Sequence, residues 1–454
     1  MNVCKVFVPY GSVGLLGMSD AEFDAGLAMS PDVIAVDAGS TDSGPYYLGT
    51  GKCKYADNAV RRDIRQCVLG ADKLSVPFLV GSLQTSGTDG GVDYVEKMVR
   101  EICAEENIKN KKIVKIYTEQ DPAIIKQKYL DGKLNPLHNA PDIDENTFEK
   151  CSHIVALGGA EPFIQALQEG ADIVLCGRCT DTAVIAAMPI MRGCSASAAW
   201  HGAKVTECGP QCADKWQGGG GVLLTVDEDG FEVEPTEKDS HCTPFSTSAH
   251  MIYENADPFR LVEPGHILDV TDAIYTPVSD RRVRVTGSRL EKMPYTMKLE
   301  GVAATGYQTI SIVGIQDRYI MKDPMRWVDG INSYMDKKLK ENGYPSDEYT
   351  CDLRVYGWNG ISNQYIEPGS FIPKEICVVL IVTAKTQELA DQIAKAWNPQ
   401  LLHYSVEPGN MATFAFLFSP NEISRGVLYE FMLNHAVLVD SPTELIRFET
   451  VLID

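Results

Sequence analysis

The residues best suited to chemistry lie in one short stretch, residues 171–182. There an apolar run leads into Gly177-Arg178 and then Thr180-Asp181. Gly177 permits a tight exit from a strand, and the planar guanidinium of Arg178 can hold a carboxylate or a phosphate through two hydrogen bonds. Thr180 and Asp181 could also cap a following helix. The stretch therefore predicts an anion-binding site at a strand end.

Arg178 has a second interpretation, as one partner of a structural ion pair. A buried arginine commonly forms a structural ion pair, and Asp37, at the end of another apolar run, is a suitable partner. Residue types alone leave both interpretations open.

Several other predicted strand ends are also polar and rich in glycine. Ligands of open parallel sheets bind beyond the carboxyl ends of the strands, where glycine lets backbone N–H groups approach an anion. One such loop more often only turns the chain, but five together predict a small-molecule site. The candidate binding residues in these loops are Gly11, Ser12, Ser40, Thr41, Thr88 and Gly159, together with Gly177 and Thr180.

Known cofactor motifs are not apparent. The glycines Gly11, Gly14 and Gly17 do not have the spacing of a dinucleotide-binding loop, so NAD is disfavoured even though Asp37 lies at a suitable distance. Nothing indicates PLP or an Fe–S cluster, and no P-loop occurs. Two cysteine pairs, Cys176/Cys179 and Cys208/Cys212, have spacings that a zinc site could use, but ordinary unpaired thiols are favoured.

The bulk composition limits the function classes. The net charge is −21, from 62 acidic and 41 basic residues among 454, which disfavours nucleic acid and anionic lipid as partners. No run of about 18 apolar residues exists, so a membrane span is not expected. The first residues read at once as a strand, without the features of a signal peptide, and the 13 cysteines are odd in number. We therefore expect a cytoplasmic protein with reduced thiols.

The order of elements predicts an α/β protein of two domains. Strand and helix patterns alternate along the first half, so residues 1–215 are expected to form a doubly wound, mostly parallel sheet domain that holds the main site. Residues 216–454 are expected to form an α+β domain, a mixed sheet with helices on one face. The break between them would fall at the glycines 218–221. The clearest predicted strands are 3–8, 32–37, 77–82, 112–117, 153–157, 172–176, 222–226, 230–234, 281–286, 309–313, 376–383 and 412–418, and the clearest helices are 92–106, 121–130, 161–168, 324–341 and 386–397.

The chain resembles the acyclic terpene utilisation (AtuA-like) family over about residues 1–300, and its last third resembles the short-form members. The resemblance rests on Gly170-Ala-Asp172, Gly177-Arg178 and Thr180-Asp181, and on Glu207-Cys-Gly-Pro-Gln211. Segments 269–272 and 283–288 and the early Asp37 also look like this family. The chain departs from it at Asp214-Lys215 and at residues 38–42, so the terpene in the family name is not carried over.

The resemblance implies a lyase, a hydro-lyase or a related enzyme that breaks C–O or C–N bonds, acting on a small hydroxy or amino di- or tricarboxylic acid. Arg178 would hold a carboxylate, while Ser40, Thr41, Thr180 and Gln211 would contact the rest. Asp37 or Asp181 would exchange protons, and Glu207 would act as a second acid or base. A divalent cation such as Mg²⁺, held by these three carboxylates, would stabilise the developing charge. Replacing Arg178 by Ala should then abolish turnover and leave the fold intact.

Three further expectations accompany this interpretation. Cys208, within the second motif, is expected to pack beside Glu207 rather than act as a nucleophile. Short-form members imply a homo-oligomer and a possible small companion protein. The alternatives are a non-catalytic subunit that needs such a partner chain, or an acyl-CoA hydratase-type enzyme of terpenoid breakdown.

Overall fold

The computed structural model describes residues 2–15, 18–215 and 220–454. They form two compact units. The first consists of Met1–Ala303 and Phe431–Asp454, and the second of Ala304–Glu430. Gly17, and Gly218 and Gly219 of the expected break between domains, lie outside the described residues.

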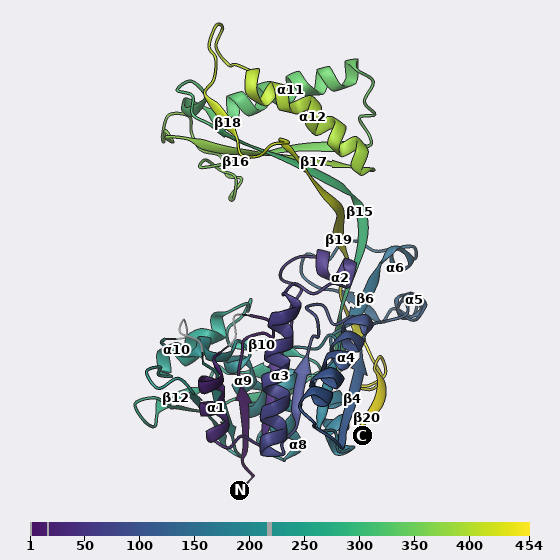
Figure 1. Cartoon of the computed structure of the whole chain (residues 1–454), viewed down its shortest axis with the longest axis vertical. Coiled ribbons are helices and arrows are strands. Elements are labelled where there is room, and N and C mark those ends of the chain that lie inside the picture. Colours follow the sequence, from purple (N-terminus) through teal and green to yellow (C-terminus); the bar gives the residue numbers. More distant parts are fainter. Residues whose placement is uncertain (1, 16–17, 216–219) are drawn as a thin grey trace. The chain divides into compact units, whose positions relative to one another are not determined.

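A sheet of ten strands forms the centre of the first unit (Figure 1). Its order is β12-β13-β9-β8-β1-β2-β3-β7-β4-β20. The five strands from β1 to β4 in this order pair in parallel, and the flanking strands pair antiparallel. The bounds are β1 Cys4–Val8, β2 Val33–Asp37, β3 Phe78–Gly81, β4 Lys111–Tyr117, β7 Ile173–Cys176, β8 Val222–Val226, β9 Gly230–Pro235, β12 Ile274–Pro277, β13 Val283–Thr286 and β20 Arg447–Ile453.

Helices of the first unit cover the buried parallel strands at the centre of the sheet. Successive residues of the parallel strands belong to two different apolar clusters, Val33 and Ala35 to one, and Ile34 and Val36 to the other. This alternation is the period of two expected for a sheet buried on both faces. The helices are α1 Asp20–Ala28, α2 Tyr46–Thr50, α3 Asp57–Leu74, α4 Asp89–Glu105, α5 Pro122–Leu130, α6 Thr147–Lys150, α7 Glu161–Gln168, α8 Ala183–Met191, α9 Ala196–Thr206 and α10 Pro244–Ala249.

Local signals explain why several of these helices begin where they do. Ser19 and Glu22 form a reciprocal capping box at α1, and Asp121 caps α5 ahead of a proline at its first turn. Helix α3, with 18 residues, was not predicted.

The mixed α/β class predicted from the sequence is confirmed.

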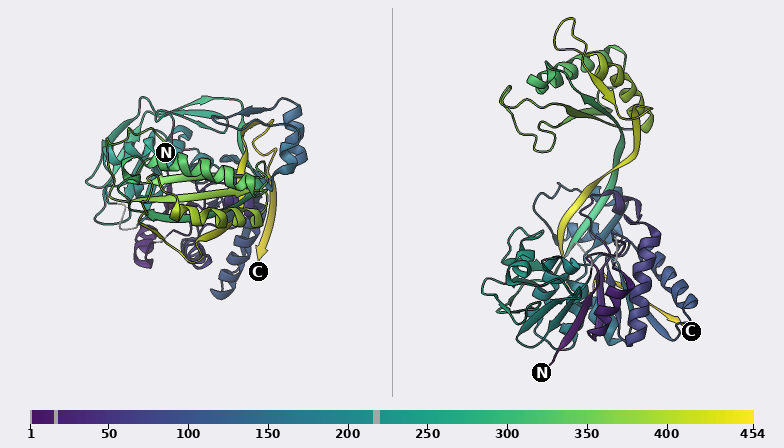
Figure 2. Two further views of the ribbon diagram at one scale, coloured as in Figure 1. Left: turned by 90° about the horizontal axis from the view of Figure 1, so that it is seen from above. Right: turned by 60° about the vertical axis from the view of Figure 1, so that its left-hand side comes forward.

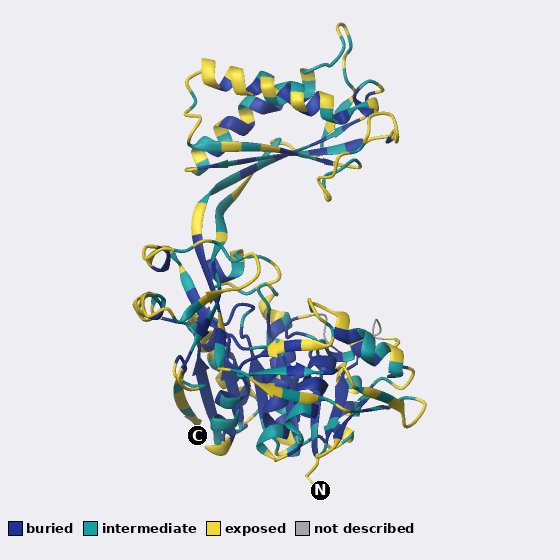
Figure 3. Cartoon of the chain, turned by 180° about the vertical axis from the view of Figure 1, so that it is seen from behind, coloured by how far each residue is buried: buried dark blue, intermediate teal, exposed yellow. Residues whose placement is uncertain are grey.

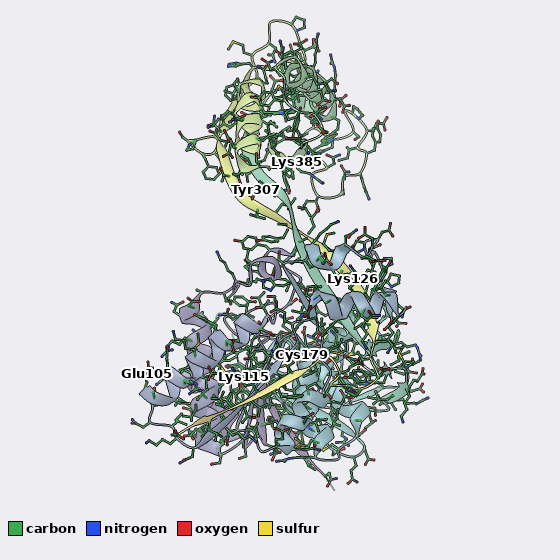
Figure 4. The ribbon with its side chains drawn as sticks, turned by 90° about the vertical axis from the view of Figure 1, so that its right-hand side faces the viewer. Glu105, Lys115, Lys126, Cys179, Tyr307 and Lys385 are labelled. Atoms are coloured by element: carbon green, nitrogen blue, oxygen red, sulfur yellow. The ribbon has the colours of Figure 1, made fainter. Side chains whose placement is uncertain are left out.

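The division of the chain differs from the expected boundary at residue 215. Strand β8 pairs with all five residues of β1, and β9 and β13 continue the same sheet. Residues beyond 215 therefore complete the first sheet instead of starting a new domain. The C-terminal strand β20 also returns to this sheet, beside β4, where Glu449 forms an ion pair with Lys115 (Figure 4).

Two smaller groups of strands complete the first unit. Strands β10 Arg260–Glu263, β11 His266–Asp269 and β14 Arg289–Lys292 form a three-stranded antiparallel sheet. Strand β6 His153–Ala156 does not join the parallel strands, because it pairs antiparallel with β15 Thr296–Ile315. The short β5 Leu134–Pro136 pairs with β19 Glu422–Leu438. Strands β15 and β19 each run from one unit into the other.

The second unit is a sheet with two helices on one side (Figure 2, right). Alternate residues of β17, among them Val378 and Leu380, are buried, and the inner faces of the helices are buried with them (Figure 3). The bounds are β16 Tyr349–Tyr356, β17 Ile376–Ala384, β18 Phe414–Phe416, α11 Pro324–Glu341 and α12 Gln387–His403. In the described part of the chain, no helix combines the length and the apolar character needed to cross a membrane.

Candidate active site

A cavity of about 480 Å³ lies in the first unit. Its volume falls within the range of small-molecule pockets. Four residues predicted from the sequence line it, namely Arg178, Thr180, Asp181 and Glu207. Polar residues that were not predicted line it as well, among them Thr182, Lys204, Glu254, Arg260, Glu263 and Lys298.

Arg178 enters this cavity from the turn after β7, next to Cys179, which is labelled in Figure 4. Its backbone N–H donates to Thr118 Oγ1 at 2.6 Å. Its Nη1 donates to Ser82 Oγ at 2.9 Å and to the carbonyl oxygen of Gly39 at 3.3 Å. Its Nε donates to Glu300 Oε2 at 3.2 Å. The loops after β2 and β3, together with strand β15, therefore fix one edge of the guanidinium, and the loop after β4 holds the backbone of Arg178.

The two interpretations of Arg178 both have support in this geometry. The ion pair exists, but its main partner is Glu300 rather than Asp37. Asp181 is a second partner, with Oδ1 3.5 Å from Nη1. Nη2 makes no hydrogen bond with the described residues, and Arg178 still lines the cavity. One nitrogen is thus left to meet a ligand.

Glu300, on β15, is the buried counter-charge. Its side chain is 2% exposed and accepts from Arg178, from Thr41 Oγ1 at 2.9 Å and from Lys298 Nζ at 2.9 Å. Burial opposes ionisation, but the charges of Arg178 and Lys298 outweigh it and lower the pKa of Glu300 to about 2. Thr41, which we predicted to bind substrate, donates a hydrogen bond to this carboxylate.

After Glu300, the carboxylates whose charges act most on Arg178 are Asp181 and Asp37. Asp37 is buried, and its Oδ2 accepts from the backbone N–H of Gly39 at 2.9 Å. Its Oδ1 has no hydrogen-bond partner among the described residues. Burial and then the charge of Asp181 raise the pKa of Asp37, while Arg178 opposes this. Asp37 does not line the cavity, so Asp181 is the carboxylate in direct reach of a ligand.

A second acid–base group faces the same cavity. Lys204 and Glu207, one helical turn apart at the end of α9, form a buried ion pair. Burial and the neighbouring charges of Asp181 and Glu263 raise the pKa of Glu207 to about 8, against the effect of Lys204. Burial also raises the pKa of Glu263 to about 7. Two carboxyl groups are therefore able to hold a proton near neutral pH.

The predicted helix cap after Asp181 is not formed as expected. Helix α8 begins at Ala183 with Thr182 at the N-cap position and no side-chain cap bond. The Thr182 hydroxyl donates instead to Glu263 Oε1 at 2.8 Å, and Thr180 Oγ1 lies 3.1 Å from Thr182 Oγ1. A buried carboxylate competes successfully for this hydroxyl, because leaving it without a donor would be costly.

The other predicted binding residues do not line the cavity. Thr88 caps α4, and Ser40 accepts from the N–H of Asp42 in its own turn. Ser12 is buried, and its Oγ has no partner among the described residues. Gln211 is exposed.

Three of the predicted glycines allow close packing. A Cβ at Gly11 would lie 2.8 Å from the carbonyl oxygen of Cys208, so the loop after β1 packs against the Glu207 motif. A Cβ at Gly177 would lie 2.6 Å from Thr118 Oγ1. At Gly159 a Cβ would collide with Tyr295 Oη.

Metal ligands and reactive thiols are not evident in the described residues. No group of three or more His, Cys, Asp or Glu side chains there is placed to hold a metal ion, so Asp37, Asp181 and Glu207 do not form such a set. All 13 cysteines are free. Burial and the charge of Glu207 raise the pKa of the Cys208 thiol, which disfavours the reactive thiolate.

The structure is that of a mixed α/β protein with a polar cavity beside the turn that follows β7. The chain belongs to the AtuA family, described as "acyclic terpene utilisation family protein AtuA", because the model of this family matches residues 89–414. Neither the curated proteins nor the solved structures gave a significant match. The matched region includes the cavity residues from Arg178 to Lys298 and extends beyond residue 300, but it begins after Asp37.

Sequence patterns missed the acid and base partners of the predicted residues. In residues 297–303, Glu300 and Lys298 are the only charged residues of an otherwise apolar run. An acid in such a run indicates a buried charge. Lys204 stands three residues before Glu207, the spacing of neighbours on one helix face. Glu263 and its place beside the cavity had no local signal.

Proposed function

We propose that this protein is a lyase that removes water or ammonia from a small hydroxy or amino acid. One observation carries the proposal. Proton-holding carboxyl groups, Glu207 and Glu263, share a cavity with Asp181 and with the cations Arg178 and Lys298. An elimination needs this combination, a base, an acid and fixed positive charge.

The proposed roles follow from position. Arg178 Nη2 and Lys298 Nζ hold the substrate carboxylate and stabilise the negative charge that develops on it. Asp181 takes the proton from the carbon next to that carboxylate. Glu207, protonated below about pH 8, gives its proton to the leaving hydroxyl or amine as the carbon–oxygen or carbon–nitrogen bond breaks and the double bond forms. Lys204 holds Glu207 in place.

We also infer that the five parallel strands form a doubly wound core. The two apolar clusters on alternate strand residues support this. In such sheets ligands bind beyond the carboxyl ends of the strands, where Arg178 follows β7.

The proposal is tested with the purified chain and a panel of hydroxy and amino di- and tricarboxylic acids. Release of ammonia, or ultraviolet absorbance of the new double bond, reports turnover. Glu207→Gln should lose turnover, whereas Glu101→Gln, which removes an acid from an exposed ion pair, should keep it. Equal turnover by both variants would exclude Glu207 as the acid.

A subunit that acts only with a partner chain is the second candidate. It is favoured by large apolar side chains that are almost fully exposed, such as Ile361 at 89%, Met411 at 85% and Tyr365 at 84%. Apolar side chains mark an interaction surface when they gather in one place, and Ile361 and Tyr365 belong to the exposed segment 361–372, which also carries the exposed Phe371 and Ile372. Turnover of any small acid by the purified chain alone would eliminate this candidate.

A further inference from the structure

A second cavity, of about 380 Å³, lies entirely within the second unit. It is lined by Arg318 and Lys322 from the turn before α11, by Lys374 from the segment before β17, and by the apolar residues Met321, Ile372 and Pro373. We propose that this cavity binds the phosphate group of a small ligand.

The three cations are available to a ligand. Within the described residues, none of them forms an ion pair with a carboxylate. This contrasts with the candidate active site, where Arg178, Lys204 and Lys298 are all paired. The guanidinium of Arg318 lies over the Tyr319 ring, 4.6 Å from its centre, and Nη2 donates to Tyr319 Oη at 2.5 Å. That contact fixes the guanidinium but leaves its charge unneutralised.

The single acid of the lining, Asp317, is occupied elsewhere. Its Oδ1 accepts from the backbone N–H groups of Tyr319 and Ile320 at 2.9 Å and 3.0 Å, and its Oδ2 accepts from Asn410 Nδ2 at 2.9 Å. Asp317 is buried, and these bonds hold the loop that carries Arg318 in one conformation. The lining keeps an excess of positive charge in a protein whose net charge is −21.

The lining also indicates the class of ligand. Arginine and lysine together are the side chains that bind phosphate oxygens most readily, through forked and point-charge contacts. Ile372 is 56% exposed beside them, and Met321 and Pro373 add apolar surface. A volume of about 380 Å³ holds a phosphate and a small attached group. Free phosphate and a phosphate ester share the recognised group.

Calorimetric titration of the full chain at low ionic strength tests the proposal, with inorganic phosphate and phenyl phosphate as probes. We expect saturable binding of at least one probe. The triple variant Arg318→Gln, Lys322→Gln, Lys374→Gln should weaken it about tenfold or more, because three partly exposed charge contacts are lost. Tighter binding of phenyl phosphate than of inorganic phosphate, lost in Ile372→Ser, would support the ester as the source. Equal binding would support free phosphate.

A matched control separates a site from general attraction. Lys109→Gln, Lys340→Gln, Arg425→Gln also removes three exposed cations, none of them in an ion pair with the described residues or in the cavity. This variant should bind like the parent chain. Absence of saturable binding to the parent, or equal weakening in both triple variants with unchanged circular dichroism, would overturn the proposal.

Discussion

Replacing Glu300 by Gln is expected to destabilise the first unit strongly. Glu300 is 2% exposed and receives hydrogen bonds from Arg178, Lys298 and Thr41. Glutamine keeps the shape but loses the charge, and its N–H₂ group must face one of these donors. Arg178 would remain buried without its main counter-charge, and removing one partner of a buried pair costs about 3–5 kcal/mol.

The pKa of Glu300 gives an independent magnitude. It lies at about 2, below its ordinary value of 4.5, and the difference corresponds to about 3 kcal/mol of stability. Because the pKa is lower in the folded state, this stability is fully present above pH 4.5 and is lost as the pH falls toward 2. Near pH 3 about half of it should remain. The difference between parent and variant should therefore shrink by about half from pH 7 to pH 3.

The assay is urea unfolding followed by circular dichroism at both pH values. Because the chain has two compact units, hydrogen exchange of the peptide spanning β7 isolates the response of the first. Glu101→Gln, in an exposed ion pair with Arg61 of the same unit, is the control and should cost less than about 1 kcal/mol. A cost for Glu300→Gln no larger than the control at pH 7, or one unchanged at pH 3, would refute the assignment.

Three other outcomes are expected. Gly87→Ala should lower the free energy of unfolding, measured in urea, by more than about 1–3 kcal/mol, because φ is +68° and the new Cβ would meet the backbone of Arg178. Gly90→Ala, with open space around the new Cβ, should leave the free energy of unfolding unchanged or raise it slightly. If Glu207 is the general acid, turnover should fall as the pH rises through about 8, and Glu207→Gln should lower kcat about 10²–10⁴-fold. A flat alkaline profile would contradict that role. Thr182→Val removes the hydroxyl that donates to Glu263, so carbon NMR of the labelled Glu263 carboxyl should show that its pKa rises above about 7. An unchanged or lower pKa of Glu263 would argue against the hydrogen bond.

Local patterns in the sequence were sufficient for many elements of the fold. Helices α7 and α11 begin and end at the residues that the sequence pattern predicts. These features depend on residues within one turn or one strand of each other, so they can be recognised without knowing the rest of the chain.

Pairing between distant segments could not be predicted in this way. Strand β20 lies beside β4, more than 300 residues earlier, and β6 leaves the parallel strands to pair with β15. A strand's alternation shows which residues are buried but not which neighbour buries them. The expected boundary at residue 215 failed for this reason, because the hairpin after it completes the first sheet.

The candidate site shows the same limit. The sequence located Arg178, Asp181 and Glu207, because glycine, arginine and acids after an apolar run are recognisable locally. Their partners come from other elements, Glu300 from β15 and Glu263 from β10. Without them, the two interpretations of Arg178 could not be distinguished, and the expectation that Arg178→Ala leaves the fold intact did not include the ion pair with Glu300.

A double variant can separate the two roles of Arg178. Arg178→Met alone leaves the Glu300 carboxylate buried without its main cation. Glu300→Leu alone leaves the Arg178 guanidinium buried without its main carboxylate. Each single variant should lose about 3–5 kcal/mol, but the pair of apolar side chains removes both charges and should regain most of that stability.

Turnover should respond differently, because Arg178 lines the cavity and its Nη2 makes no hydrogen bond with the described residues. The refolded double variant should remain inactive toward any acid that the parent chain converts. Recovery of both stability and turnover would show that Arg178 serves the fold alone and that Lys298 suffices to hold the substrate carboxylate. If Arg178 both stabilises the fold and binds the ligand, the double variant should recover stability but not turnover.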